Sequence, residues 1–303
     1  MLSGVLNIYK EKGYTSHDVV AKMRGILKQK KIGHTGTLDP DAQGVLPVCL
    51  GQATKLCDIL TEHHKTYRAV MLLGTETDTE DISGRILEET PVTCSQEQVR
   101  NAITGYIGTY EQVPPMYSAV KVGGKKLYEL ARQGKVVERK ARPVVIYGIR
   151  IEEIRLPRVT MTVECSKGTY IRTLCHDIGR TLGCGGCMES LVRTRTGQFG
   201  IEESISLSQL EKIRDEGLIE DYLISVEEIL KNYPALYAKE ETDRLLKNGN
   251  PISIETAKRE GVLPFPPEDG MRFRMYDSGK IFLGVYECEM EKQRLKAWKM
   301  FPE

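Results

Sequence analysis

The chain has 303 residues, of which 28% are charged and 40% are hydrophobic, and its formal net charge is +1. This is an ordinary soluble, globular profile, which suits one large domain or two. It contains no apolar run of membrane-spanning length and no secretory signal, so we expect a cytoplasmic protein with reduced cysteines and no membrane partner.

The first predicted element is a helix that begins at Ser16, a favourable N-cap residue. Apolar residues then recur on one helical face, at Val19, Val20, Met23, Ile26 and Leu27. The basic residues 28–31 suit the negative C-terminal end of such a helix.

Residues 33–47 read GHTGTLDPDAQGVLP, a segment too rich in glycine and proline for a helix or a central strand. Pro40 disfavours a helical conformation at Asp39, so Asp39-Pro40 predicts a turn. A rigid loop can present a carboxylate as nucleophile or base, but an isolated Asp-Pro more often only caps a turn.

Residues 65–74 predict a buried strand that ends at Gly74, and residues 75–81 a polar loop. From the strand alone, Tyr67 is a core residue with a satisfied hydroxyl. Residues 159–165 alternate as a second strand, a turn follows at 166–169, and a helix is expected from Ile171 to Leu182. Arg172 then lies in the first helical turn, where its charge opposes the helix dipole.

Charge is distributed unevenly along the chain. Residues 120–142 contain eight basic and two acidic residues, whereas residues 202–228 contain nine acidic and two basic ones. The basic stretch is able to form a face for phosphates, with a short helix around Tyr128, Leu130 and Ala131. The acidic stretch is interpreted as solvated helix surface.

A domain boundary is expected near residues 232–234. Beyond it, short strands at 272–276 and 281–286, separated by a glycine turn, suggest a small β-barrel. Cys184 and Cys187 form a Cys-Gly-Gly-Cys segment, but the second cysteine pair of a metal ribbon is missing, so no metal site is expected.

Several of these segments together resemble the bacterial tRNA pseudouridine-55 synthases, the TruB family. The matching segments are GHTGTLDP with GVLP and GQATK (residues 33–55), GTETDTED (74–81), SKGTYIRT (166–173) and LVRTRTGQF (191–199). KEKGYTS (10–16) also matches, except that Glu11 replaces the usual proline.

The resemblance implies a catalytic role for Asp39, which Arg172 pairs with, and for Tyr67, which stacks on the target base. It also implies that Leu191 lines the uracil pocket and that Lys10 belongs to the substrate-binding set. His34 would take the place of an extruded base, although it could equally support the turn.

The implied fold is α+β: a mixed, mostly antiparallel central sheet flanked by helices, with a C-terminal β-barrel similar to a PUA domain. The catalytic domain would span residues 1–232 and the RNA-binding domain 233–303. A thumb insertion at about 112–142 would grip the tRNA T-arm stem-loop, with Lys125 and Lys126 on the RNA.

The implied reaction breaks the N-glycosidic bond of uridine 55, turns the uracil and rejoins it through C5. It involves no redox change and no energy input, so no cofactor is expected, and the chain has no phosphate-binding glycine motif. We expect a monomer that needs no guide RNA. Two alternatives remain: an RNA-guided synthase, which lacks the thumb segment 123–132, and a non-catalytic RNA chaperone.

Overall fold

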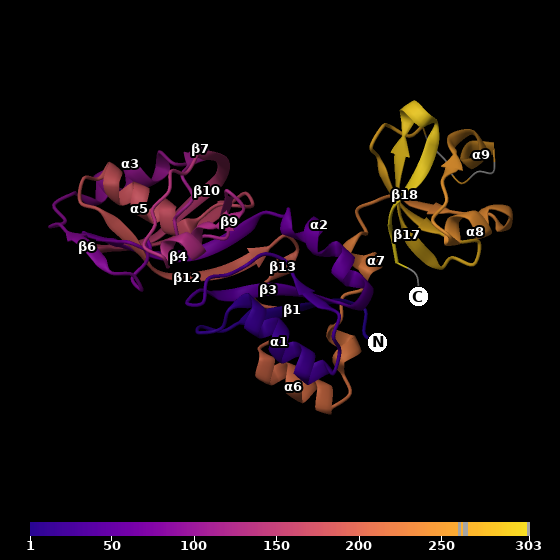
Figure 1. The fold of residues 1–303 in the computed structure, drawn as a ribbon, viewed down its shortest axis with the longest axis horizontal. Coiled ribbons are helices and arrows are strands. Elements are labelled where there is room, and N and C mark those ends of the chain that lie inside the picture. The colour runs from indigo at the N-terminus through magenta and orange to yellow at the C-terminus, as the bar shows by residue number, and fades with distance from the viewer. Residues whose placement is uncertain (260–261, 263–265, 302–303) are drawn as a thin grey trace.

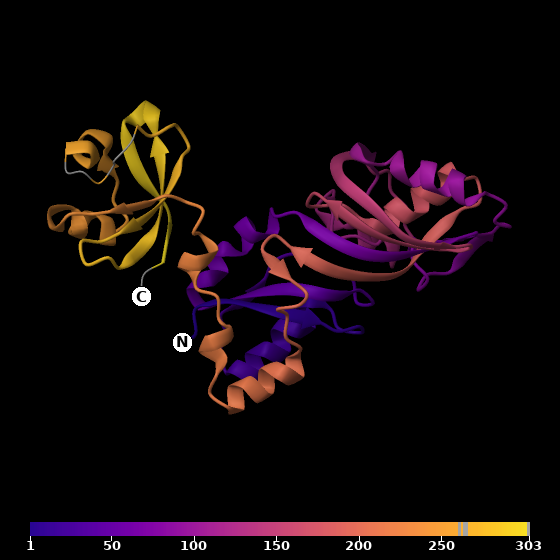
Figure 2. The same cartoon turned by 180° about the vertical axis from the view of Figure 1, so that it is seen from behind.

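The structure is a computed structural model that describes residues 1–259, 262 and 266–301 (Figure 1). A long twisted sheet with its helices makes up one part of the molecule. A second, smaller sheet at the C-terminal end stands beside it in both views (Figures 1 and 2). The N-terminus lies near the place where the two parts meet.

The main sheet has nine strands in the described part of the chain, with β1-β3-β12-β4-β11-β10-β7 as its central order. The strands are β1 (Gly4–Lys10), β2 (Ile32–His34), β3 (Gln43–Leu50), β4 (Lys65–Leu73), β7 (Gly108–Gln112), β10 (Arg142–Arg155), β11 (Arg158–Cys165), β12 (Gly186–Thr196) and β13 (Phe199–Gly200). The pair β3·β12 is parallel, and the other pairs are antiparallel. The predicted mixed, mostly antiparallel sheet is therefore confirmed.

Two pairs of helices cover this sheet. Helices α1 (Ser16–Leu27) and α6 (Leu207–Asp215) pack on β1, β2 and β3, while α3 (Gln96–Thr104) and α5 (Ile171–Thr181) pack on β4, β10, β11 and β12. The short elements η1 (Gly51–Leu56), α2 (Cys57–Thr61), η2 (Ile219–Tyr222) and α7 (Val226–Ile229) complete this part. The acidic segment 202–228 includes α6, whose apolar residues face the core while its charged ones are mostly exposed.

Helix α1 follows its predicted pattern but begins with a different cap. Thr15 is the N-cap, and it forms a capping box with Asp18. The predicted cap, Ser16, is buried, and its Oγ accepts a hydrogen bond from the Leu38 amide at 3.0 Å. Serine is on average the better cap residue, but Asp18 lies three positions after Thr15 and completes a capping box, whereas Val19 follows Ser16 at that spacing.

Two loop predictions need correction. Residues 43–47 belong to β3, between β1 and β12, so only residues 35–42 form the expected loop. Pro47 is accommodated in this central strand, and its carbonyl accepts from the Thr35 amide at 3.1 Å. In the second loop, β5 (Thr75–Thr77) pairs with β6 (Ile86–Glu89), so only part of residues 75–81 is irregular.

The basic segment lies between β7 and β10. It contains a hairpin of β8 (Lys121–Val122) and β9 (Lys125–Lys126), followed by α4 (Leu127–Ala131), where a short helix was expected. Met116, Leu127 and Leu130 form its own small core. The segment therefore has a small apolar core in addition to those of the main sheet.

The C-terminal part is a curled five-stranded sheet of order β14-β16-β17-β18-β15, a half-barrel with a core of its own. Its elements are β14 (Ala235–Tyr237), α8 (Glu240–Lys247), β15 (Ile252–Ser253), α9 (Ile254–Arg259), β16 (Arg272–Tyr276), β17 (Phe282–Glu289), η3 (Met290–Lys292) and β18 (Arg294–Met300). The expected strands at 272–276 and 281–286 correspond to β16 and β17. The predicted range 233–303 also includes 260–261, 263–265 and 302–303, which lie outside the described residues.

An apolar cluster and ionic contacts join the two parts. Val285 and Phe301 share a buried cluster with Val5 and Leu56 of the main part. Lys299 Nζ lies 2.7 Å from Asp58 Oδ2. No helix in residues 1–259, 262 and 266–301 has the length and apolar character needed to cross a bilayer.

Candidate active site

Asp39 lies in the loop of residues 35–42, which connects β2 to β3. Leu38 is buried and anchors the loop, and the Pro40 carbonyl accepts from the Gly13 amide at 2.9 Å. The Asp39 side chain is nevertheless 41% exposed. A fixed loop thus presents a carboxylate that solvent or a substrate can reach.

Arg172, in the first turn of α5, holds this carboxylate in the pairing that the resemblance implies. Its Nε donates to Asp39 Oδ2 at 3.0 Å, and its Nη2 donates to Oδ1 at 3.3 Å. The arginine side chain is only 5% exposed. A planar guanidinium that contacts both oxygens fixes the orientation of the carboxylate as well as its position.

Three further groups hold Arg172, and the sequence analysis did not assign them. Its Nη1 donates to the Thr79 carbonyl and its Nη2 to the Tyr117 carbonyl, each at 2.9 Å. Asp81 Oδ2 lies 3.7 Å from Nε, so two carboxylates offset a charge that the helix dipole disfavours. The acidic composition of residues 75–81 was the available signal for Asp81, whereas a carbonyl contact leaves no trace in the sequence.

Tyr67 and Leu191 lie on the neighbouring strands β4 and β12. Both are buried and belong to the apolar cluster that also contains Leu38, next to Asp39. Burial raises the pKa of the Tyr67 hydroxyl, and the guanidinium of Arg193 acts in the opposite direction. The structure therefore brings an aromatic ring and an aliphatic wall to the Asp39 loop. Arg193 is a buried residue that the sequence analysis did not single out.

Lys10 was predicted to bind the substrate, but the structure places its side chain inside the protein. It is 0% exposed, and its Nζ donates to the carbonyls of Glu11, Tyr14 and Pro40 at 3.1, 2.6 and 3.0 Å. Burial lowers the Lys10 pKa to about 8, although Asp39 nearby acts to raise it. The side chain braces the Asp39 loop from within, so the predicted direct substrate contact is not available in this arrangement.

His34 ends β2 on the approach to the loop. It is half-buried, and its ring makes an edge contact with His17 at a centroid distance of 5.3 Å. Its Nδ1 is buried without a hydrogen-bond partner in the described residues. Burial, and secondarily His17, lowers the His34 pKa, so the neutral ring is favoured.

Lys125 and Lys126 form strand β9 of the β8–β9 hairpin. Lys125 is exposed, while Lys126 is half-buried with its Nζ 3.3 Å from the Tyr128 hydroxyl. The other basic residues of this segment are also exposed or half-buried: Lys121, Arg132, Lys135, Arg139, Lys140 and Arg142. The thumb insertion contacts the carboxylate site through the Tyr117 carbonyl, which accepts from Arg172.

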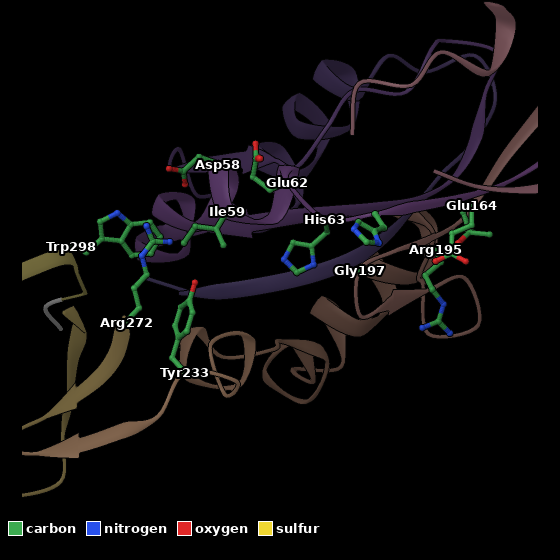
Figure 3. Close-up of a pocket in the computed structure, with 12 residues that line it drawn as sticks. Asp58, Ile59, Glu62, His63, Glu164, Arg195, Gly197, Tyr233, Arg272 and Trp298 are labelled. Carbon is green, nitrogen blue, oxygen red and sulfur yellow. The ribbon is translucent and has the colours of Figure 1, made fainter. Parts of the chain in front are cut away.

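A cavity of about 750 Å³ lies elsewhere, between α2 and the C-terminal half-barrel (Figure 3). Its lining includes His63, Tyr233 and Trp298, and the Arg272 guanidinium lies 3.6 Å from the centre of the Trp298 ring. The Asp39 carboxylate does not border it. This cavity is therefore separate from the candidate active site.

Within residues 1–259, 262 and 266–301, no three His, Cys, Asp or Glu side chains cluster as a metal site would require. Cys175, Cys184 and Cys187 are instead buried free thiols.

Comparison with protein families decides the assignment. The N-terminal domain model of the TruB family pseudouridylate synthases matches residues 24–171, and a tRNA pseudouridylate synthase B C-terminal domain model matches residues 172–231. The chain belongs to the TruB family. The family identification made from the sequence motifs is thereby confirmed, and the protein is an enzyme of the pseudouridylate synthase class.

Individual relatives and solved structures agree with TruB membership. The chain is 49% identical over 308 residues to a tRNA pseudouridine synthase B of Lachnoclostridium phytofermentans, covering 99% of this chain and 100% of the relative. It is 46% identical to that of Clostridium acetobutylicum over 94% of this chain and 95% of the relative.

Two solved structures share the TruB-type fold. A Cbf5–Nop10–Gar1 complex matches with a TM-score of 0.74 at 26% identity, over 99% of this chain and 85% of that chain. An H/ACA RNP bound to a substrate RNA containing 2′-deoxyuridine matches with a TM-score of 0.72 at 24% identity, over the same shares. The second match concerns the fold alone.

Proposed function

We propose that the protein converts uridine 55 in the T-arm loop of tRNA into pseudouridine, with Asp39 as the catalytic carboxylate. Relatives named tRNA pseudouridine synthase B support a tRNA substrate. The observation that carries the proposal is the accessible Asp39 carboxylate, which a buried arginine orients through both of its oxygens.

The reaction needs one carboxylate beside the ribose and the base. Asp39 has three possible parts: attack at C1′, attack at C6, or removal of the 2′ proton. In each of them the Arg172 guanidinium would keep the two carboxylate oxygens of Asp39 in a single orientation as the glycosidic bond breaks. The base then turns and rejoins the ribose through C5, and the C5 proton leaves.

The target base must first leave the stack of the T-loop, at a cost of a few kcal/mol. Stacking on the Tyr67 ring would return about 1–3 kcal/mol of this. Leu191 would close the pocket on the uracil. The Tyr67 hydroxyl would take part in removing the C5 proton, and His34 would occupy the space that the extruded base leaves.

We assign catalysis to residues 1–232 and RNA binding to residues 233–303, in a monomer that acts in the cytoplasm. The thumb, residues 112–142, would grip the stem-loop directly through its exposed basic side chains, including Lys125 and Lys126. Direct contact of this kind requires no guide RNA, and isomerisation requires no cofactor. A protein that only binds or refolds tRNA would have no use for the oriented Asp39 carboxylate.

The test uses purified protein, unmodified tRNA transcript, and no added guide RNA, metal or cofactor. Pseudouridine is mapped by chemical labelling and primer extension. We expect one modified position, uridine 55, and no modification in a transcript with cytidine at that position. Modification at other uridines, or only when a guide RNA is added, would contradict the proposal.

A further inference from the structure

Arg193 is a buried cation that has no role in the proposed reaction as described so far. Its side chain is 1% exposed, and within the described residues it forms no ion pair, so no carboxylate oxygen lies within 4.0 Å of it. An arginine cannot release its proton, and burying a charge without a charged partner is unfavourable. Such a residue needs a use that outweighs this cost.

The contacts of Arg193 hold both ends of the Asp39 loop. Its Nε donates to the Val45 carbonyl at 2.7 Å, and its Nη2 donates to the Gly36 carbonyl at 3.4 Å. Gly36 lies near the start of the loop, and Val45 lies in β3, just after its end. A single guanidinium therefore ties together the two sides of the segment that carries the carboxylate.

The backbone of β12 approaches the same loop closely. Arg193 pairs with Gly44 of β3, where φ is +105°. A Cβ atom at Gly44 would lie 2.2 Å from the Arg193 carbonyl oxygen, so only glycine fits. The strand pairing and the side-chain contacts thus place Arg193 at one fixed distance from the loop.

Arg193 also faces Tyr67. The two residues are opposite each other in the β4·β12 pair. The guanidinium lowers the pKa of the Tyr67 hydroxyl, against the upward effect of burial. The same side chain therefore binds the carboxylate loop and acts electrostatically on the Tyr67 hydroxyl from the opposite position on the neighbouring strand.

We propose that Arg193 is a positioning residue for the isomerisation: it fixes the Asp39 loop and the Tyr67 hydroxyl relative to each other. This inference rests on the proposed function, in which Asp39 and Tyr67 act on one flipped uridine. Arg193 itself does not touch the base. Its effect is to keep two reacting groups in one geometry, and a displacement of about 1 Å at such groups lowers rates about 10²-fold.

The test compares Arg193→Lys with Arg195→Lys, the same change at an exposed position of the same strand. A lysine retains the charge but lacks the planar group that binds the Val45 and Gly36 carbonyls together beside Tyr67. The single-turnover rate at saturating tRNA, the Kd for tRNA and the thermal midpoint are measured for each. We expect Arg193→Lys to lower the rate about 10²-fold with a Kd within about threefold of wild type. Arg195→Lys should retain the wild-type rate.

A double-mutant cycle with Tyr67→Phe separates positioning from a general weakening of the fold. If Arg193 acts through the Tyr67 hydroxyl, Arg193→Lys should lower the rate much less in the Tyr67→Phe background than in wild type. An equal factor in both backgrounds, or a near-normal rate for Arg193→Lys alone, would overturn the inference. If the lysine variant does not fold, Arg193→Gln takes its place in the same cycle. Inactive wild-type protein would instead contradict the proposed function.

Discussion

Replacing Arg172 by lysine tests the pairing that orients Asp39. The guanidinium contacts both carboxylate oxygens, at 3.0 and 3.3 Å, and also two carbonyls at 2.9 Å. A lysine ammonium at this site is a point charge that can satisfy only part of this set. Each lost hydrogen bond to a charged group is worth about 1.5–3 kcal/mol. Because about 1.4 kcal/mol corresponds to tenfold in rate, losing two of these contacts, about 3–6 kcal/mol, predicts a fall of about 10²–10⁴-fold.

The assay is single-turnover pseudouridine formation at saturating tRNA, with the Kd for tRNA measured separately. Arg180→Lys is the control, because Arg180 lies on the same helix with its side chain 65% exposed. The rate and the thermal midpoint of Arg180→Lys should match wild type. Arg172→Lys loses buried hydrogen bonds, so its thermal midpoint should fall, and its rate is measured at a temperature where it is still folded. Near-normal turnover by folded Arg172→Lys would show that catalysis does not need the two-point contact between the arginine and Asp39. The role inferred for Arg172 from its geometry would then be wrong.

Three further substitutions probe the site and the thumb. Asp39→Asn should abolish isomerisation while tRNA binding stays within a few-fold of wild type, because the amide has the same size but cannot act as nucleophile or base; turnover above contamination levels would remove Asp39 from its role. Tyr67→Phe should bind tRNA normally and lose most activity, and full activity would reduce Tyr67 to a stacking platform. Combined Lys125→Ala and Lys126→Ala should lower the slope of log K against log salt by roughly one unit per lost phosphate contact. Lys212→Ala, on the acidic α6, should leave that slope unchanged, whereas parallel lines with equal affinity for the double variant and wild type would show that the thumb charges are only solvated surface.

Local patterns in the sequence predicted a large part of the fold. The apolar face of α1, the alternation of β11 and the helix that carries Arg172 are all signals within a few neighbouring residues. The errors are local as well: Thr15 caps α1 instead of Ser16, and residues 43–47 are strand. In that strand, the ladder with β1 and β12 outweighs the local preference of glycine and proline for turns.

The remaining features depend on contacts between distant segments. Arg172 meets Thr79 across 93 positions of sequence, and Arg193 meets Val45 across 148. Neither contact produces a periodic pattern or a characteristic spacing that could be recognised in the sequence alone. The burial of Lys10 was missed for the same reason, because its ammonium is enclosed by backbone carbonyls, one of which, from Pro40, comes from the Asp39 loop.

The most direct test of the central claim follows the hydrogen that pseudouridine formation must displace. A tRNA transcript carrying tritium at C5 of uridine 55 alone is incubated with the protein, without guide RNA or cofactor, and tritium in the water is counted. Reattachment of the base through C5 predicts release approaching one tritium per tRNA with wild type and none with Asp39→Asn. No release by wild type, or equal release by both proteins, would contradict the account.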